Sequence, residues 1–328
     1  MGEIGFRKGD ILAVPIPFRN ALLGNGLALG AGYLFTSDPG SAPSFLGIAG
    51  FKTENDSEAY GAGVNLSLDD NRWQLGLFAG KADINYDFPL GPIDLPFHQT
   101  GRFAALNAGY GVTDALSFGV TLRYLDTDLG LQRGVLPDRF RPEANLSILS
   151  YGLTAGWDRR DDTIYPTDGF QLSAAAYQGD MTGSASGSYR KATLLYDLYH
   201  PIGASSVVAG RLAGCAATEE APFFDSCSIG GTDAFRGYSP TDYIGDRLAS
   251  VQVALRARLN RRFGLVVFAG TGSVGKEFGD LGSGDWHSAA GLGARIRLSK
   301  SYPLDYSIDL SRNDNHEDIL YLYVGQRF

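Results

Sequence analysis

The feature that most constrains this chain is a repeated alternation of apolar residues with small or polar ones, in short segments and without a long apolar run. Residues 60–68 carry tyrosine, alanine, valine and leucine at even positions, and glycine, asparagine and serine at odd positions. Residues 116–124 repeat the pattern. A period of two indicates a β-strand with one apolar face. One face of each segment therefore suits hydrocarbon, while the other tolerates water.

Sixteen segments follow this pattern and are predicted to be strands: 10–18, 26–35, 45–53, 60–68, 72–87, 102–112, 115–127, 147–158, 169–178, 188–200, 205–214, 247–259, 262–274, 286–298, 303–311 and 319–328. Each is near the roughly 9 to 11 residues with which a tilted strand crosses a bilayer. Short connections alternate with long ones, as at the two rims of a barrel. The prediction is an all-β fold, a single transmembrane antiparallel β-barrel of about 16 strands that occupies residues 1–328.

A soluble sandwich or propeller is the alternative fold. The faces opposite the apolar ones contain glycine, serine, threonine and single charges, which would form a poor core but suit a wet barrel interior. With 44 Gly, 17 Tyr and 19 Phe, the chain is too aromatic for a disordered protein. A net charge of -8 and the absence of a basic stripe exclude nucleic acid as an expected partner.

Two cysteines, Cys215 and Cys227, are separated by eleven residues. A disulfide that closes this local loop would imply an oxidising compartment, and the alternative is two unpaired thiols. No basic segment followed by an apolar segment comes after Met1. If the barrel prediction is right, we expect the signal peptide to have been removed before this sequence begins.

Catalytic chemistry is not indicated. The four histidines, His98, His200, His287 and His316, show no metal-ligand spacing. Residues 270–275 imitate a dinucleotide-binding glycine motif, but no helix is expected after them. We therefore expect no catalytic residues, no metal and no cofactor.

Three stretches resemble one family. A glycine-flanked arginine turn at residues 230–238 is similar to the tip of the sixth extracellular loop in the Omp85 superfamily; the matching residues are Gly230, Gly231, Phe235, Arg236, Gly237 and Tyr238. Residues 157–162 with 165–169 resemble a stretch of the bacterial surface antigen (D15) domain. Residues 15–30 look like the start of members without POTRA domains. The chain resembles such BamA/TamA-like outer-membrane barrels.

The resemblance implies a barrel whose loop 6, residues 215–246, folds back into the interior. It also implies an amino-terminal segment with a weak first strand at residues 1–25, which meets the last strand at a lateral seam. Pro15 and Pro17 agree with a weak seam because proline has no N–H to donate, although they could merely end a strand early. Phe328 ends the last strand and resembles the carboxy-terminal assembly signal of outer-membrane barrels.

The function implied by the resemblance is insertion or translocation of polypeptides at the bacterial outer membrane, without nucleotide or cofactor. Expected partners are unfolded outer-membrane client polypeptides, outer-membrane lipids and lipopolysaccharide, the last through acidic tips at residues 54–58 and 314–318. A passive or plugged channel, a structural barrel, or the translocator of a passenger domain outside this sequence are the alternatives.

Two positions depart from the family pattern. Acidic partners of the loop arginine are expected at positions that here are Ala254 and Gly270. Because alternate residues of a strand lie on the same face, Asp305 and Asp309 are candidate partners of Arg236 in place of the missing acids, and Asp158 is a third candidate. The remaining possibilities are backbone carbonyls, stacking on an aromatic ring such as Tyr321 or Tyr323, or a loop that is not locked.

Overall fold

The computed structural model describes residues 9–20, 22–90, 93–132, 143–230, 235–298 and 303–326, so Gly231 and Phe328 lie outside the described residues. The strands are β1 (Asp10–Asn20), β2 (Gly24–Phe35), β3 (Ser44–Thr53), β4 (Glu58–Leu68), β5 (Trp73–Leu90), β6 (Ile93–Gly111), β7 (Leu116–Leu131), β8 (Glu143–Asp158), β9 (Gly169–Gly183), β10 (Gly187–Ile202), β11 (Ser206–Ala217), β12 (Cys227–Ile229), β13 (Tyr243–Gly245), β14 (Arg247–Arg258), β15 (Phe263–Gly275), β16 (His287–Arg297), β17 (Asp305–Asn313) and β18 (Asp318–Val324).

Sixteen of these strands follow one another in a hydrogen-bonded order that closes on itself, with β1 paired to β18. Neighbouring strands are antiparallel, and β12 and β13 form a separate two-stranded sheet. The helical turns η2 (Phe223–Asp225) and α1 (Asp280–Ser283) have three and four residues. The prediction of an all-β, sixteen-stranded antiparallel barrel is confirmed.

Within the described residues, no helix combines the length and the hydropathy that a membrane span requires.

Several strands are longer than the alternation predicted. β5 has 18 residues, β6 has 19 and β7 has 16. The apolar face ends before the hydrogen-bonded ladder does, because the next outward positions are Lys81, Arg102 and Asp126. β12 and β13 were not predicted, since three residues are too few to show a period. The predicted strands therefore stop short of the observed ones: at residue 87 instead of Leu90 on β5, at 102 instead of Ile93 at the start of β6, and at 127 instead of Leu131 on β7.

The chain forms two compact units. The first comprises residues 1–17, 23–156 and 175–190. Its outward face is apolar, as the alternation on β7 shows: Val120 and Leu122 are 53% and 44% exposed, whereas Thr121 between them is 3% exposed. The predicted direction of each face is confirmed on this strand.

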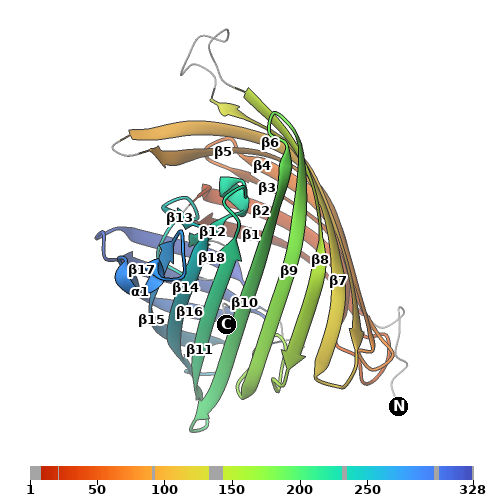
Figure 1. Ribbon diagram of the computed structural model, residues 1–328. Coiled ribbons are helices and arrows are strands. Elements are labelled where there is room, and N and C mark those ends of the chain that lie inside the picture. The colour runs from red at the N-terminus through yellow and green to blue at the C-terminus, as the bar shows by residue number, and fades with distance from the viewer. Residues whose placement is uncertain are drawn as a thin grey trace. The chain divides into compact units, whose positions relative to one another are not determined.

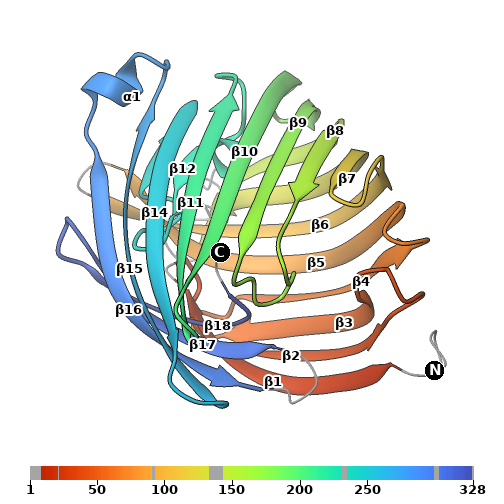
Figure 2. The same cartoon turned by 90° about the horizontal axis from the view of Figure 1, so that it is seen from below.

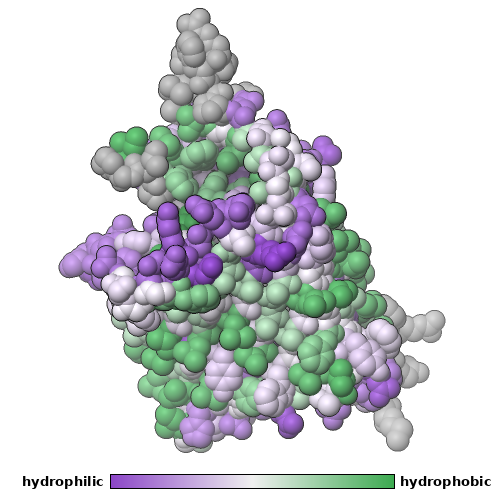
Figure 3. Space-filling model, in the orientation of Figure 1, coloured by the Kyte–Doolittle hydropathy of each residue, from purple (hydrophilic) through white to green (hydrophobic). Residues whose placement is uncertain are grey.

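The second unit comprises residues 18–22, 157–174 and 191–328. Its strands β11, β14, β15 and β16 lie side by side (Figure 1, Figure 2). Hydrophobic residues predominate in the lower part of the surface over these strands, and polar residues gather above them near β12, β13 and α1 (Figure 3). The opposite face is polar and buried, most clearly on β17, where the inward residues are Asp305, Ser307, Asp309, Ser311 and Asn313.

One close approach in the first unit requires glycine. A Cβ atom at Gly152 on β8 would lie 2.2 Å from the carbonyl oxygen of Ala176 and 2.4 Å from the Cβ of Tyr177, both on β9. The Tyr177 ring is fixed in turn by the Arg123 guanidinium, which lies 4.9 Å from the ring centre. Backbone atoms of β9 would have to move to admit any side chain at position 152.

We expect Gly152→Ala to destabilise the barrel by about 1–3 kcal/mol, because the added methyl group meets backbone atoms rather than a mobile side chain. Urea unfolding in detergent, followed by tryptophan fluorescence, measures the change. Gly214→Ala on β11 is the control, since a Cβ there meets no atom within 4 Å. Equal unfolding midpoints for the two variants would contradict the close packing of β8 on β9.

Candidate functional site

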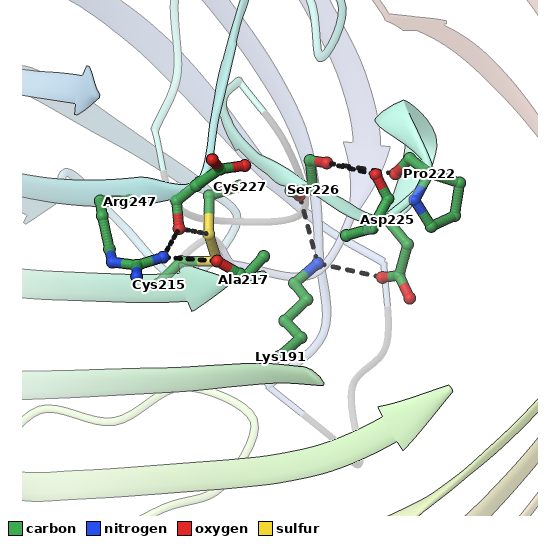
Figure 4. The surroundings of a disulfide bond; sticks show 10 residues. Lys191, Cys215, Ala217, Pro222, Asp225, Ser226, Cys227 and Arg247 are labelled. Carbon is green, nitrogen blue, oxygen red and sulfur yellow. Dashed lines mark hydrogen bonds and ion pairs between the residues drawn. A yellow bond between two sulfur atoms is a disulfide. The ribbon is translucent and has the colours of Figure 1, made fainter. Parts of the chain in front are cut away.

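The connection from β11 to β14 carries the arginine turn, and we call its described residues 218–230 and 235–246 the loop-6 segment. Its base is tied to β11 by a disulfide between Cys215 and Cys227, with a Cα to Cα distance of 5.7 Å (Figure 4). Lys191 on β10 forms an ion pair with Asp225 at 3.0 Å. The cysteines are therefore paired rather than free thiols, and one end of the segment is covalently fixed.

Two aromatic residues of the loop-6 segment are buried against the strands. Phe235 and Tyr238 are buried in a cluster with residues of β11, β14 and β16. A Cβ atom at Gly270 on β15 would lie 2.7 Å from Cε2 of Phe235 and 2.4 Å from Cγ of Gln252. Glycine at position 270 therefore leaves space for the Phe235 ring, and an aspartate there would have no room.

Arg236 is held by contacts of three kinds. Its Nη1 lies 2.9 Å from Oδ2 of Asp309, and the side chains are 2% and 0% exposed. Its Nε donates to Oε1 of Gln252 at 3.3 Å, and the guanidinium carbon lies 3.8 Å from the centre of the Phe268 ring. A buried guanidinium requires a carboxylate and hydrogen bonds to offset its desolvation. Asp309 supplies that charge from β17.

Asp309 also serves a second arginine. Nη1 of Arg295, on β16, lies 2.5 Å from Oδ1 of Asp309, and the Tyr323 hydroxyl donates to Oδ2 at 2.7 Å. One buried carboxylate thus accepts hydrogen bonds from a loop residue, from β16 and from β18. Loss of this carboxylate would leave two buried guanidinium groups without their shared counter-charge.

The other two acidic candidates have different partners. Asp305 pairs with Arg258 at 2.6 Å and with Arg297 at 2.7 Å. Asp158 pairs with Arg160 at 2.6 Å. Asp305 also accepts a hydrogen bond from the side-chain amide of Gln326 at 2.8 Å. The charges that parity placed on one face are indeed neighbours, but they are divided among several arginines.

Gly237 is fixed by the last two strands. Its N–H donates to the Tyr321 hydroxyl at 2.9 Å, and its carbonyl accepts from Nδ2 of Asn313 at 3.0 Å. Its φ angle is 125°, and a Cβ atom would lie 2.3 Å from the Cβ of Ala289. Only glycine suits both the backbone conformation and this contact. Tyr321 and Tyr323 therefore bind the site through their hydroxyl groups, while the stacked ring is that of Phe268.

Tyr238 ends the arginine turn and binds a loop aspartate. Its hydroxyl donates to Oδ1 of Asp314, between β17 and β18, at 2.5 Å. Burial alone would raise the pKa of Asp314, but hydrogen bonds from Tyr238 and from the N–H of Ser288 hold this pKa below its ordinary value. The turn is thus bound to the strand connection as well as to the strands.

The second motif, between β8 and β9, is a compact turn. Asp161 accepts hydrogen bonds from the N–H groups of Thr167 at 2.8 Å and Asp168 at 3.1 Å. Asp162 accepts from the N–H groups of Ile164 and Tyr165, both at 2.7 Å. Burial would raise the pKa of Asp161, yet hydrogen bonds from Thr167 lower it overall. These bonds give the turn a defined shape.

This turn contacts the same arginine-bearing face as the loop-6 segment. The guanidinium carbons of Arg256, Arg258 and Arg297 lie 4.9, 4.7 and 5.6 Å from the centre of the Tyr165 ring. Nη2 of Arg256 also donates to the carbonyl oxygen of Pro166. Cation-to-ring contacts of this kind favour positive charge near the ring. The turn therefore binds arginines of β14 and β16, and two of these, Arg258 and Arg297, pair with Asp305 on β17. The loop-6 segment binds Asp309 on the same strand.

The strands that close the barrel are β1 and β18, in a register that pairs Arg19 with Leu322. Pro15 and Pro17 lie within β1 and supply no N–H to a ladder. The predicted aromatic end, Phe328, is outside the described residues. In the described part of the chain, no group of three or more His, Cys, Asp or Glu side chains is arranged to hold a metal.

We expect Asp309→Asn to destabilise the barrel by about 3–5 kcal/mol, because two buried guanidinium groups lose their carboxylate. The unfolding midpoint in urea measures the loss. Arg312→Gln is the matched control on the same strand: its ion pair with Asp318 is exposed, at 61% and 57%, and its loss should cost less than about 1 kcal/mol. Similar midpoints for both variants would show that Asp309 does not hold the site together.

Comparison with known proteins relates these elements to a family. Solved structures that resemble this chain include BamA from Haemophilus ducreyi lacking POTRA domains 1–3, with 14% identity, a TM-score of 0.62, and 97% of this chain and 70% of that chain covered. CdiB from Acinetobacter baumannii has 13% identity and a TM-score of 0.61, and the match covers 96% of this chain and 59% of that chain. CdiB from Escherichia coli has 14% identity and a TM-score of 0.61, and the match covers 98% of this chain and 68% of that chain.

No curated protein matches the sequence. A family model, the Omp85 superfamily domain, matches residues 83–328, which include both the turn after β8 and the loop-6 segment. A closed barrel of sixteen strands and a match over this range together show that the chain belongs to the Omp85 superfamily.

Proposed function

We propose that this chain is a bacterial outer-membrane barrel that assists the insertion or translocation of polypeptides, and that residues 215–246 are its inward-folded loop 6. Family membership supports the general role, and the outward apolar face suits a bilayer. The proposed clients are unfolded outer-membrane polypeptides. The proposed reaction needs no nucleotide or cofactor, because strand pairing and burial of apolar surface drive insertion.

The observation that carries this proposal is the attachment of the loop-6 segment to β18, the strand that closes the barrel against β1. Tyr321 accepts the N–H of Gly237, and Tyr323 donates to the carboxylate that binds Arg236. Gln326, just beyond β18, contacts Asp305 and Arg295 at 2.8 and 3.1 Å. β18 is thus positioned by side-chain bonds on its inner face in addition to its ladder bonds.

These bonds suggest how the seam could be controlled. β1 contains two prolines, so its ladder has fewer N–H donors than an ordinary strand of eleven residues. A parted seam exposes the edge of β1 or β18, and an exposed edge is a template for an incoming strand. In our proposal the loop-6 segment holds β18 in the closed arrangement, and a client strand competes for the edge when β18 separates from β1.

A disulfide across the seam tests the proposal. Arg19→Cys with Leu322→Cys places two thiols at directly paired positions of β1 and β18, where Cα atoms of antiparallel strands are within bridging distance. We expect a client barrel to insert into liposomes that contain the oxidised variant no faster than it inserts into protein-free liposomes. Reduction should restore the wild-type rate. Protease protection of the client measures insertion.

Two controls make the result specific. Leu310→Cys with Leu320→Cys bridges β17 to β18, which do not part in this proposal, and should leave the rate unchanged. Wild-type protein with reductant accounts for opening of the native Cys215–Cys227 disulfide. Full activity of the oxidised seam variant would refute a role for the seam, and a wild type that never accelerates insertion would refute the proposed function.

A further inference from the structure

A row of polar side chains crosses four strands of the first unit on its outward face. Tyr60 on β4 pairs with Lys81 on β5, Lys81 with Arg102 on β6, and Arg102 with Asp126 on β7. Tyr60 is 61% exposed, and the row continues the faces that carry the exposed apolar residues of these strands. The row therefore lies where the outward surface changes from apolar to charged.

Two cations stand directly opposite each other in this row. Lys81 and Arg102 are register partners on β5 and β6, and like charges at such positions destabilise a sheet. Among the described residues, neither side chain forms an ion pair with a carboxylate. An anionic group bound between the two would remove their repulsion.

Carboxylates lie beside this cationic pair. The next row contains Glu58, Asp83, Thr100 and Asp128, which are register partners from β4 to β7. On the β8 side, Asp126 accepts a hydrogen bond from the Ser147 hydroxyl at 2.8 Å. The two rows line an open cavity of about 310 Å³. Its charged lining consists of two cations and four carboxylates: Lys81, Arg102, Glu58, Asp83, Asp126 and Asp128.

The row on the opposite side of the charged row is apolar and consists mostly of small side chains. Ala62, Ala79 and Ala104 are consecutive register partners on β4, β5 and β6, followed by Tyr124 on β7. The row beyond them is bulkier, with Val64, Leu77, Leu106 and Leu122. The three adjacent methyl side chains are smaller than the side chains of the row beyond them. The charged cavity thus adjoins a row of small apolar side chains.

We propose that this surface binds a phosphoethanolamine lipid, with the phosphate between Lys81 and Arg102, the ammonium at the neighbouring carboxylates, and an acyl chain over the three alanines. The inference rests on the proposed membrane location. A headgroup with both charges matches a lining of both signs. A purely anionic headgroup would bind the two cations but would bring no positive charge to the four carboxylates. The ammonium can donate three hydrogen bonds to those carboxylates.

Native mass spectrometry of the full chain in detergent tests the assignment with phosphatidylethanolamine, phosphatidylcholine and phosphatidylglycerol as probes. We expect phosphatidylethanolamine to bind about tenfold more tightly than phosphatidylcholine, whose quaternary ammonium cannot donate hydrogen bonds. Equal affinity of the two, or tighter binding of phosphatidylglycerol, would overturn the proposal. Tighter binding of lipid A with Mg²⁺ would also overturn it. These comparisons use the wild-type protein, so they do not depend on whether a variant folds.

Variants then locate the site. Lys81→Gln with Arg102→Gln should weaken phosphatidylethanolamine binding about tenfold. Arg72→Gln with Arg312→Gln removes two exposed arginines elsewhere and should leave it unchanged. Asp83→Asn with Asp126→Asn should shift the preference toward phosphatidylglycerol. Unchanged phosphatidylethanolamine binding by the Lys81→Gln, Arg102→Gln variant would overturn the assignment of the lipid to this cavity. Lipid selectivity with no client insertion would contradict only the proposed function, whereas insertion without selectivity would contradict only this inference.

Discussion

The buried carboxylate of Asp309 is the interaction on which the rest of the site depends. Removing a carboxylate and a guanidinium from water costs several kcal/mol each, and only close pairing with additional hydrogen bonds offsets this cost. Asp309 meets that condition by accepting from Arg236, Arg295 and Tyr323 together. Each of these donors comes from a different element, so the position of the carboxylate decides where the loop-6 segment, β16 and β18 lie relative to one another.

Much of the fold could be predicted because alternation is a direct consequence of strand geometry. Each of the sixteen barrel strands overlaps a segment found from apolar and small residues alone. Strand ends were harder, since a ladder continues wherever backbone groups can pair, whatever the outward side chain is. At β5 and β6 the ladder extends past Lys81 and Arg102, where the apolar face has already ended. Side-chain chemistry therefore marks the boundary of the apolar surface and not the end of the strand.

The site was predictable in its charges but not in its packing. Parity alone places Asp305 and Asp309 on the inner face beside the arginines, and Asp309 is the one that pairs with Arg236. Which arginine takes which carboxylate depends on strand register, which the sequence does not show. The role of Phe268 depends on Gly270 beside it: the glycine admits Phe235, and Phe235 brings Arg236 over the neighbouring ring. An absent acid at position 270 was visible in the sequence, whereas the ring that fills its space was not.

The disulfide at the base of the loop-6 segment has a consequence for the order of assembly. Cys215 and Cys227 are separated by 12 positions, so the bridge can form while the rest of the chain is unfolded. Arg236 and Gly237, in contrast, bind partners 73 and 84 positions further along the chain. One end of the loop can be anchored early, but the carboxylate that binds Arg236 and the hydroxyl that accepts from Gly237 are in place only after β17 and β18 have joined the sheet. A docked arginine turn is therefore a mark of a completed barrel.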